Sequence, residues 1–218
     1  MQVKLIALTQ PIAEFGSPMS AEELITYCAR VSNPMNQLNF DTSERLLQYL
    51  CRHGHWSPFE MVQAVIEIKT TRDIARQILR HRSFSFQEFS QRYTQVQEKP
   101  IFREARLQDQ KNRQQSLPNE DDSLDKWWES QQQLIANAAQ DIYGQAIERG
   151  IAKEVARVVL PEGTTPTCLY MSGSLRSWIH YLQLRTKSET QKEHREIAVA
   201  CRELLEKQFP SLGAILYE

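Results

Sequence analysis

The segment from residue 61 to residue 81 constrains the fold most, because a strand pattern passes into a helix pattern with no linker between them. In "MVQAVIEIK" the apolar residues at 62, 64, 66 and 68 alternate with mostly polar ones, which predicts a half-buried β-strand. Two threonines then precede "RDIARQILRH", and either can cap a helix there. Because Arg72, Arg76 and Arg80 are spaced four residues apart, we expect their guanidinium groups on one helical face.

Other periodic segments predict two further strands and six further helices. We expect the strands at 3–10 and 167–172, and the helices at 20–33, 43–53, 123–149, 152–160, 174–185 and 188–208. Ser20 with Glu23, and Ser188 with Gln191, have the spacing of capping boxes that open the first and last of these helices. Residues 98–122 are poor in β-branched residues, so we expect a long loop or insertion there, within one domain of 218 residues.

Composition excludes several classes of protein. A formal net charge of -1 argues against a protein that coats nucleic acid by bulk electrostatics. No apolar run approaches the roughly 18 residues of a membrane span, and the N-terminus is too polar for a signal peptide, so we expect a cytoplasmic protein without membrane contact. The four cysteines form no C-x-x-C pair, and the seven glycines form no nucleotide-binding fingerprint. Bound phosphates would therefore be met by side chains, for which arginine is best shaped.

The stretch "RHRSFSFQEFSQRY", residues 80–93, concentrates three arginines, a histidine, a glutamate and three serines. We expect its end to be extended through Tyr93, which places Glu88, Ser90 and Arg92 on one side of the strand. Guanidinium groups beside a carboxylate and hydroxyls suit a small anionic ligand. The residues alone leave a solvated basic surface equally open.

The segment "HGHWSPFE" places His53 and His55 two residues apart, so a metal site is one alternative here. No histidine in the chain is followed by Asp, and no H-E-x-x-H motif occurs. We therefore predict no metal site.

Five segments resemble motifs of the flavin-dependent thymidylate synthases, and they occur in that family's order. They are "CARVSN" at 28–33, "HGHWSPFE" at 53–60, "RHR" at 80–82 followed by Ser90 after seven residues, "EVARVVLP" at 154–161 and "SLRSWIHYLQLRT" at 174–186. The resemblance covers the chain from about residue 28 to residue 190, and residues 98–122 are covered least.

The resemblance implies a single α/β (α+β) domain with a central, mostly antiparallel sheet flanked by long helices. It implies a homotetramer in which each site takes residues from several subunits. The implied reaction methylates dUMP to dTMP, with 5,10-methylenetetrahydrofolate as carbon donor and FAD, reduced by NADPH, as hydride source. The chain contains no Pro-Cys dipeptide, which agrees with the flavin route rather than with a cysteine nucleophile.

The resemblance also implies which residues form the sites. The residues implied to surround dUMP are Gln77, Ile78, Leu79, Arg80, Glu88, Phe89, Ser90, Gln91, Arg92, Arg157 and Arg185. Arg185 is implied to be catalytic, because a fixed cation at the uracil edge would stabilise the deprotonated N3 and make C5 a better nucleophile. The residues implied to hold FAD are Ser57, Glu60, Arg80, His81, Arg82, Glu88, Ser174, Arg176 and His180. His55 is implied near the flavin and folate, and Ser174 and His180 stand where relatives often carry Asn.

Two other functions compete with this interpretation. A single-stranded nucleic-acid-binding module would stack bases on the aromatic residues of the stretch at 80–93, but it leaves "HWSPFE" and the C-terminal arginines unexplained. A metal-dependent nucleotide phosphohydrolase would lose its activity to chelators and would contain no flavin. We expect small-molecule partners only, without nucleic acid.

Overall fold

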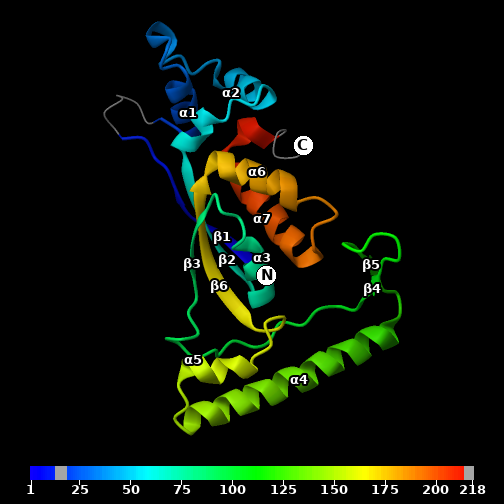
Figure 1. The fold of residues 1–218 in the computed structure, drawn as a ribbon. Helices are drawn as coiled ribbons and strands as arrows, with labels where there is room; N and C mark the ends of the chain where they lie inside the picture. The colour runs from blue at the N-terminus through cyan, green and yellow to red at the C-terminus, as the bar shows by residue number, and fades with distance from the viewer. Residues whose placement is uncertain (13–18, 214–218) are drawn as a thin grey trace.

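A computed structural model describes residues 1–12 and 19–213 of the chain. Its centre is a four-stranded sheet in the order β1-β2-β6-β3, in which every neighbouring pair is antiparallel (Figure 1). The strands are β1 (Gln2–Leu8), β2 (Gln63–Thr71), β3 (Ser85–Glu88) and β6 (Pro166–Ser174). The predicted α/β domain with a central antiparallel sheet is confirmed.

The helices surround this sheet at both ends and on one face. They are α1 (Ala21–Ala29), α2 (Ser43–Arg52), α3 (Arg72–Ile78), α4 (Asp122–Glu148), α5 (Lys153–Ala156), α6 (Leu175–Arg185) and α7 (Lys192–Gln208), with short 3-10 turns η2 (Pro34–Asn36), η3 (Ser57–Met61), η4 (Arg157–Val159) and η5 (Pro210–Leu212). The capping box of Ser20 and Glu23 is confirmed. The box predicted at Ser188 is wrong, because α7 begins at Lys192 and the Ser188 carbonyl instead accepts a hydrogen bond from Arg195.

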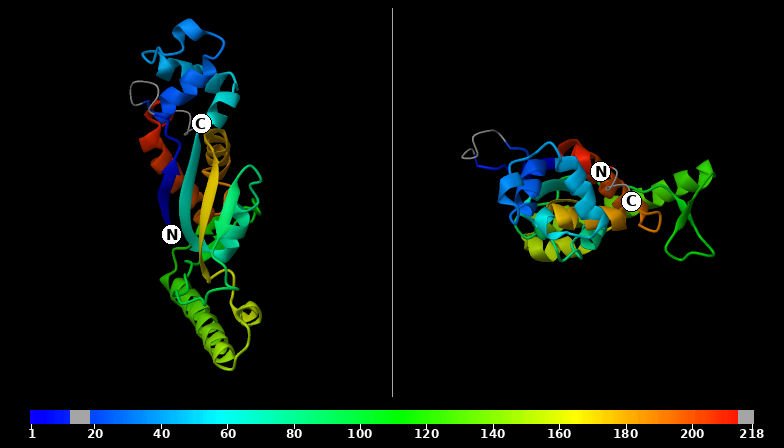
Figure 2. Two further views of the ribbon diagram at one scale, coloured as in Figure 1. Left: turned by 90° about the vertical axis from the view of Figure 1, so that its left-hand side faces the viewer. Right: turned by 90° about the horizontal axis from the view of Figure 1, so that it is seen from above.

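One face of the sheet is buried because β2 and β6 alternate in polarity. Ile66, Ile68, Leu169 and Met171 are fully buried beneath helices α6 and α7. Figure 2 (left) looks onto the opposite face, with these helices behind the strands. Trp178 of α6 is also fully buried, and its indole N–H donates a hydrogen bond to the carbonyl of residue 64 at 3.2 Å. This packing fixes α6 against the sheet.

Helix α4 lies beyond one end of the sheet, together with a small hairpin (Figure 1). The hairpin pairs β4 (Arg106–Gln108) with β5 (Ser116–Pro118), so residues 98–122 include a two-stranded ladder. Seen from above, α4 and the hairpin project sideways from the rest of the molecule (Figure 2, right). Among the described helices, α4 included, none combines the length and the apolar character needed to cross a membrane.

Gly173 permits a close approach between β6 and the ring of Phe84, so we expect Gly173→Ala to destabilise the fold. An added Cβ would lie 2.6 Å from Phe84 Cε1 and closer still to Cδ1. Phe84 cannot easily retreat, because its ring packs edge-on against Trp178 at 4.9 Å. Overpacking of this kind costs about 1–3 kcal/mol. The free energy of unfolding, measured in urea, should fall by that amount.

Gly144→Ala is the matched control for this substitution. A Cβ at Gly144, inside α4, would meet no atom within 4 Å, and its helical backbone favours alanine. We expect this variant to be more stable than the wild type by about 0.5–1 kcal/mol. A Gly173→Ala protein as stable as the Gly144→Ala protein would contradict the close-approach argument.

Candidate functional site

Helix α6 and its N-cap carry four of the residues implied to bind cofactor or substrate. Ser174 is the N-cap, and its hydroxyl accepts a hydrogen bond from the Ser177 N–H at 3.3 Å. Arg176 in the first turn forms an ion pair with Glu60 of η3. This contact, across 116 positions of sequence, brings together two of the implied flavin contacts.

His180 lies one turn after Arg176 on the same helix. Its ring packs edge-on against Trp56, with 4.7 Å between ring centroids. Partial burial, together with the positive charge of Arg176, lowers the pKa of His180, so its imidazole is mainly neutral at pH 7. His55 is exposed, and its ring centroid lies 6.0 Å from that of Tyr49.

A pocket of about 330 Å³ adjoins the Glu60 carboxylate and the start of α6. Its lining is mostly polar, with four serines among eight residues: Glu60, Met61, Gln63, Ser83, Ser85, Ser172, Gly173 and Ser174. Hydroxyls that can donate or accept hydrogen bonds suit a polar ligand rich in oxygen. Two residues of the implied flavin set line this pocket.

Arg185, the implied catalytic residue, is held by His81. The Arg185 Nε–H donates a hydrogen bond to His81 Nε2 at 2.9 Å. Burial and the charge of Arg185 lower the pKa of His81 to about 4, so the imidazole is neutral at pH 7 and Nε2 acts as acceptor. Within the described part of the chain, the two terminal amino groups of Arg185 have no hydrogen-bond partner, so they stay available for a ligand.

Glu88, at the end of β3, is held by two contacts inside the chain. It accepts hydrogen bonds from Arg72 at 3.2 Å and from the Thr167 hydroxyl at 2.9 Å. The Arg72 and Glu88 side chains are 15% and 20% exposed, which leaves part of the carboxylate open to a ligand. Phe89 adds one backbone bond, from its N–H to the carbonyl of Cys168 at 2.8 Å.

The extended segment that we predicted through Tyr93 ends at Glu88, so this prediction is wrong. The N–H groups of Tyr93 and Thr94 both donate to the Ser90 carbonyl, which closes a turn. The ladder with β6 ends at the pair Glu88–Leu169, although β6 itself extends back to Pro166. Ser90 and Arg92 therefore do not continue one side of the strand.

Two of the implied dUMP-binding arginines meet at Glu154 of α5. The Arg92 Nε–H donates to the Glu154 carboxylate at 3.1 Å, and the Arg157 Nε–H donates to the Glu154 carbonyl at 3.3 Å. The ion pair is more than half exposed, with side-chain exposures of 57% and 52%, so it contributes little stability by itself. These arginines form a second basic cluster, distinct from the Arg185–His81 pair.

Arg80 and Arg82 lie in the exposed turn that follows α3. Because α3 ends at Ile78, Arg80 does not share a helical face with Arg72 and Arg76, contrary to the prediction. Arg72 and Arg76 form ion pairs with glutamates instead. No hydrogen-bond or ion-pair partner for the Arg80 or Arg82 guanidinium occurs within residues 1–12 and 19–213.

The remaining implied dUMP contacts differ in what they can offer. Ile78 is fully buried, so only its backbone could reach a ligand. Leu79 is half-buried, and Ser57, which is implied to bind FAD instead, is exposed at the start of η3. Gln91 is buried, and its Nε2 has no hydrogen-bond partner among the described residues. A buried amide without a partner costs free energy that a bound ligand could offset.

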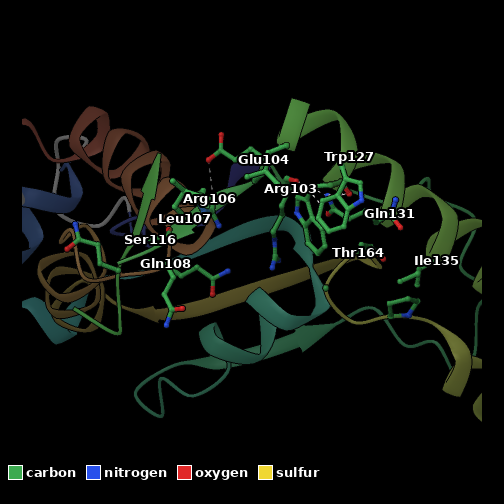
Figure 3. A pocket seen from close by; sticks show the side chains of 18 of the residues that line it. Arg103, Glu104, Arg106, Leu107, Gln108, Ser116, Trp127, Gln131, Ile135 and Thr164 are labelled. Atoms are coloured by element: carbon green, nitrogen blue, oxygen red, sulfur yellow. Dashed lines mark hydrogen bonds and ion pairs between the residues drawn. The ribbon is translucent and has the colours of Figure 1, made fainter. Parts of the chain in front are cut away.

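A further pocket is separate from all of these groups. It has a volume of about 840 Å³ and lies between α4, the β4–β5 hairpin and the Thr164 turn (Figure 3). Arg103, Trp127 and Ile135 are among its lining side chains, and none of the implied site residues is. Trp127 and Ile135 are 56% and 60% exposed, so this pocket opens onto an apolar surface of α4.

The sequence interpretation missed a buried polar group behind Gln77. His194 and Tyr181 are at most 2% exposed and are hydrogen-bonded to each other. The available signal was the position of His194 in the apolar stripe of the last helix, three residues before Ile197 and seven before Cys201. A histidine at such a position is buried and requires partners. In the part of the chain that the structure describes, no three His, Cys, Asp or Glu residues cluster as a metal site.

Comparison with known proteins places this geometry in a family. The family model described as thymidylate synthase complementing protein matches residues 17–211. A flavin-dependent thymidylate synthase from Synechocystis is 54% identical over 217 residues, and a probable one from Paramecium bursaria Chlorella virus 1 is 51% identical over 216 residues. Each match covers 99% of this chain and 99% of the relative.

A solved structure with the same fold is the UMP/dUMP methylase PolB from Streptomyces cacaoi, bound with 5-Br dUMP. It superposes with a TM-score of 0.82 at 25% sequence identity, and the match covers 98% of this chain and 94% of the methylase. Sequence motifs, family model, relatives and fold agree along nearly the whole length. The chain belongs to the flavin-dependent thymidylate synthase family.

Proposed function

We propose that this protein methylates dUMP to dTMP in the cytoplasm, with 5,10-methylenetetrahydrofolate as carbon donor and FAD, reduced by NADPH, as hydride source. The observation that carries the proposal is the Arg185–His81 pair, in which a neutral imidazole anchors a guanidinium through one N–H. The two free amino groups of Arg185 form a fixed, planar pair of donors. Such a pair matches two neighbouring acceptors at the uracil edge, an oxygen and the deprotonated N3. A cation held in advance at the uracil edge stabilises charge that develops on the ring.

The residues around the 330 Å³ pocket fit a flavin nucleotide. Serine hydroxyls line the pocket, and the Glu60–Arg176 pair lies at its edge. Arg80 and Arg82 supply exposed cations for the pyrophosphate, as expected where no glycine-rich turn binds it. FAD supplies the hydride chemistry when bound, and the protein supplies orientation and electrostatics. The folate would lie near the exposed His55.

The nucleotide phosphate is assigned to the second basic cluster. Arg92 and Arg157 converge there, and Ser90 precedes them with a hydroxyl. Because their partner Glu154 is largely exposed, a phosphate can displace it from Arg92 at little cost. Gln91 Nε2, buried without a partner, is a further donor for the nucleotide.

We further propose that the chain acts as a homotetramer with sites shared between subunits. The implied residues form two groups on one chain: the residues of α6 with His81 of the turn after α3, and the arginines at α5. Helix α4 also exposes three large apolar side chains, which we call the apolar stripe of α4. They are Leu134, Ile135 and Ile142, at 66%, 60% and 53% exposure. An apolar surface of this kind is typical of an interface between subunits.

The test of the function is the visible spectrum of the purified protein with FAD and dUMP, followed by a dTMP assay. We expect flavin bands that bleach with NADPH, and dTMP formation that requires methylenetetrahydrofolate. The assay includes UMP, since PolB is described as a UMP/dUMP methylase. A protein that retains no FAD and releases no dTMP would exclude the proposal. Salt-dependent oligonucleotide binding would then favour the nucleic-acid module.

A further inference from the structure

Five side chains form one continuous hydrogen-bonded chain behind Gln77, which we call the Gln77 relay: Tyr181, His194, Gln77, Gln191 and Glu193. The Tyr181 hydroxyl lies 3.1 Å from His194 Nε2, and His194 Nδ1 lies 3.3 Å from Gln77 Oε1. Gln77 Nε2 lies 2.7 Å from Gln191 Oε1, and Gln191 Nε2 lies 2.9 Å from Glu193 Oε2. The relay joins helices α6, α3 and α7.

The charge of Glu193 sets the direction of every bond in the relay. Burial alone raises the pKa of Glu193. Hydrogen bonds from its own backbone N–H, from Gln191 and from Arg106 outweigh that effect, so its pKa lies below the ordinary value. An ionised carboxylate only accepts hydrogen bonds. Gln191 must therefore turn its amide nitrogen toward Glu193, which leaves its oxygen to accept from Gln77.

The same argument fixes the direction of the hydrogen bond between Gln77 and His194. Because the Gln77 nitrogen donates to Gln191, the Gln77 oxygen faces His194 and must accept a hydrogen bond from it. His194 therefore carries its proton on Nδ1, and Nε2 accepts from Tyr181. His194 is completely buried, and burial together with the charge of Arg185 lowers its pKa to about 3, so it stays neutral.

We propose that His194 is a positioning residue that fixes the carboxamide of Gln77 in one orientation for the nucleotide. This inference rests on the proposed function, because Gln77 is implied to contact dUMP. The relay uses one N–H and one oxygen lone pair of Gln77, so one donor and one acceptor remain in fixed places for the ligand. Without His194, the carboxamide could turn over and exchange them.

The Gln77 relay also contacts His81, the residue that holds Arg185. The Tyr181 ring packs edge-on against His81, with 4.9 Å between centroids, and His81 accepts the hydrogen bond from Arg185. Tyr181 thus contacts two histidines that each hold a residue assigned to the nucleotide. His194 holds Gln77, and His81 holds Arg185.

The test compares His194→Leu with His194→Asn in the full enzyme. Leucine removes the donor to Gln77, whereas the asparagine side-chain nitrogen can occupy the place of Nδ1 and donate as before. We expect His194→Leu to raise the KM for dUMP about tenfold, as the loss of one positioned hydrogen bond predicts, with little change in kcat. His194→Asn should restore most of the loss. Tyr181→Phe keeps the ring contact and should raise the KM by a smaller factor.

Ile197→Val is the matched control on α7, since it removes buried volume without touching the relay. It should lower the melting temperature and leave the KM for dUMP unchanged. Equal KM values for wild type and His194→Leu would overturn the positioning role, as would equal losses in the leucine and asparagine variants. A wild-type protein that turns over no dUMP would overturn the proposed function itself, so the two failures are distinguishable.

Discussion

Arg185→Ala is expected to lower kcat for dTMP formation by about a hundredfold to a thousandfold, with a much smaller change in the KM for dUMP. The guanidinium is fixed before the substrate binds, because neutral His81 accepts its Nε–H at 2.9 Å. Its stabilisation is therefore greatest when negative charge develops on the uracil ring. Steady-state dTMP formation at varied dUMP separates kcat from KM, and flavin absorption checks that FAD remains bound.

Two other arginine variants make this result specific. Arg149→Ala, at the C-terminal end of α4, should leave both constants unchanged, because within the described residues the Arg149 guanidinium donates only to Gln145 of its own helix. Arg80→Ala should weaken nucleotide or flavin binding instead, since Arg80 is exposed and no described residue holds its guanidinium. If Arg185→Ala kept its turnover, the assigned role in uracil ionisation would be wrong.

Charges placed on the apolar stripe of α4 are expected to dissociate the enzyme and abolish FAD retention. The double variant Ile135→Glu, Ile142→Glu puts two carboxylates at positions that are 60% and 53% exposed in the single chain. The isolated subunit should tolerate them, because exposed substitutions usually change stability by less than about 0.5 kcal/mol. In an apolar interface the same charges would lose their hydration without gaining partners. Light scattering gives the mass, and the flavin band at fixed protein concentration gives the bound FAD.

The matched control uses Gln133→Glu with Gln140→Glu, which carries the same charges at the same seven-residue spacing on α4. Both glutamines are exposed and polar, outside the apolar stripe. The control should keep the wild-type mass and bound flavin. A stripe variant that becomes monomeric yet still binds FAD would show that the site is complete within one subunit, against our proposal.

Hydrophobic periodicity predicted the strands and helices well, because a strand or helix with one buried face has apolar residues at regular spacing in the sequence. The alternation in "MVQAVIEIK" became β2, and the long helix predicted at 123–149 became α4, closed by Gly150 at a φ of 81°. The family motifs also identified the family, which relatives of 51–54% identity bear out. Motifs predict identity because the chemistry of a site restricts residue type at each position.

Element ends and side-chain partners were less predictable. Helix α3 stops at Ile78 rather than near His81, so Arg80 leaves the face of Arg72. The predicted extension through Tyr93 fails because the chain turns at Ser90, whose carbonyl accepts hydrogen bonds from the N–H groups of Tyr93 and Thr94. Both ends are set by local backbone turns that hydrophobic periodicity does not mark.

The sequence by itself determined which residue types this protein has for binding anions and flavin, and which segments fold as strands and helices. Only the tertiary structure decided how these side chains are oriented. The neutrality of His81 depends on burial and on Arg185, which lies 104 positions away. The direction of the Gln77 relay depends on the charge of Glu193, which Arg106 and Gln191 stabilise. Protonation and orientation follow from the local electric field and solvent exposure, and both exist only once distant segments have packed together.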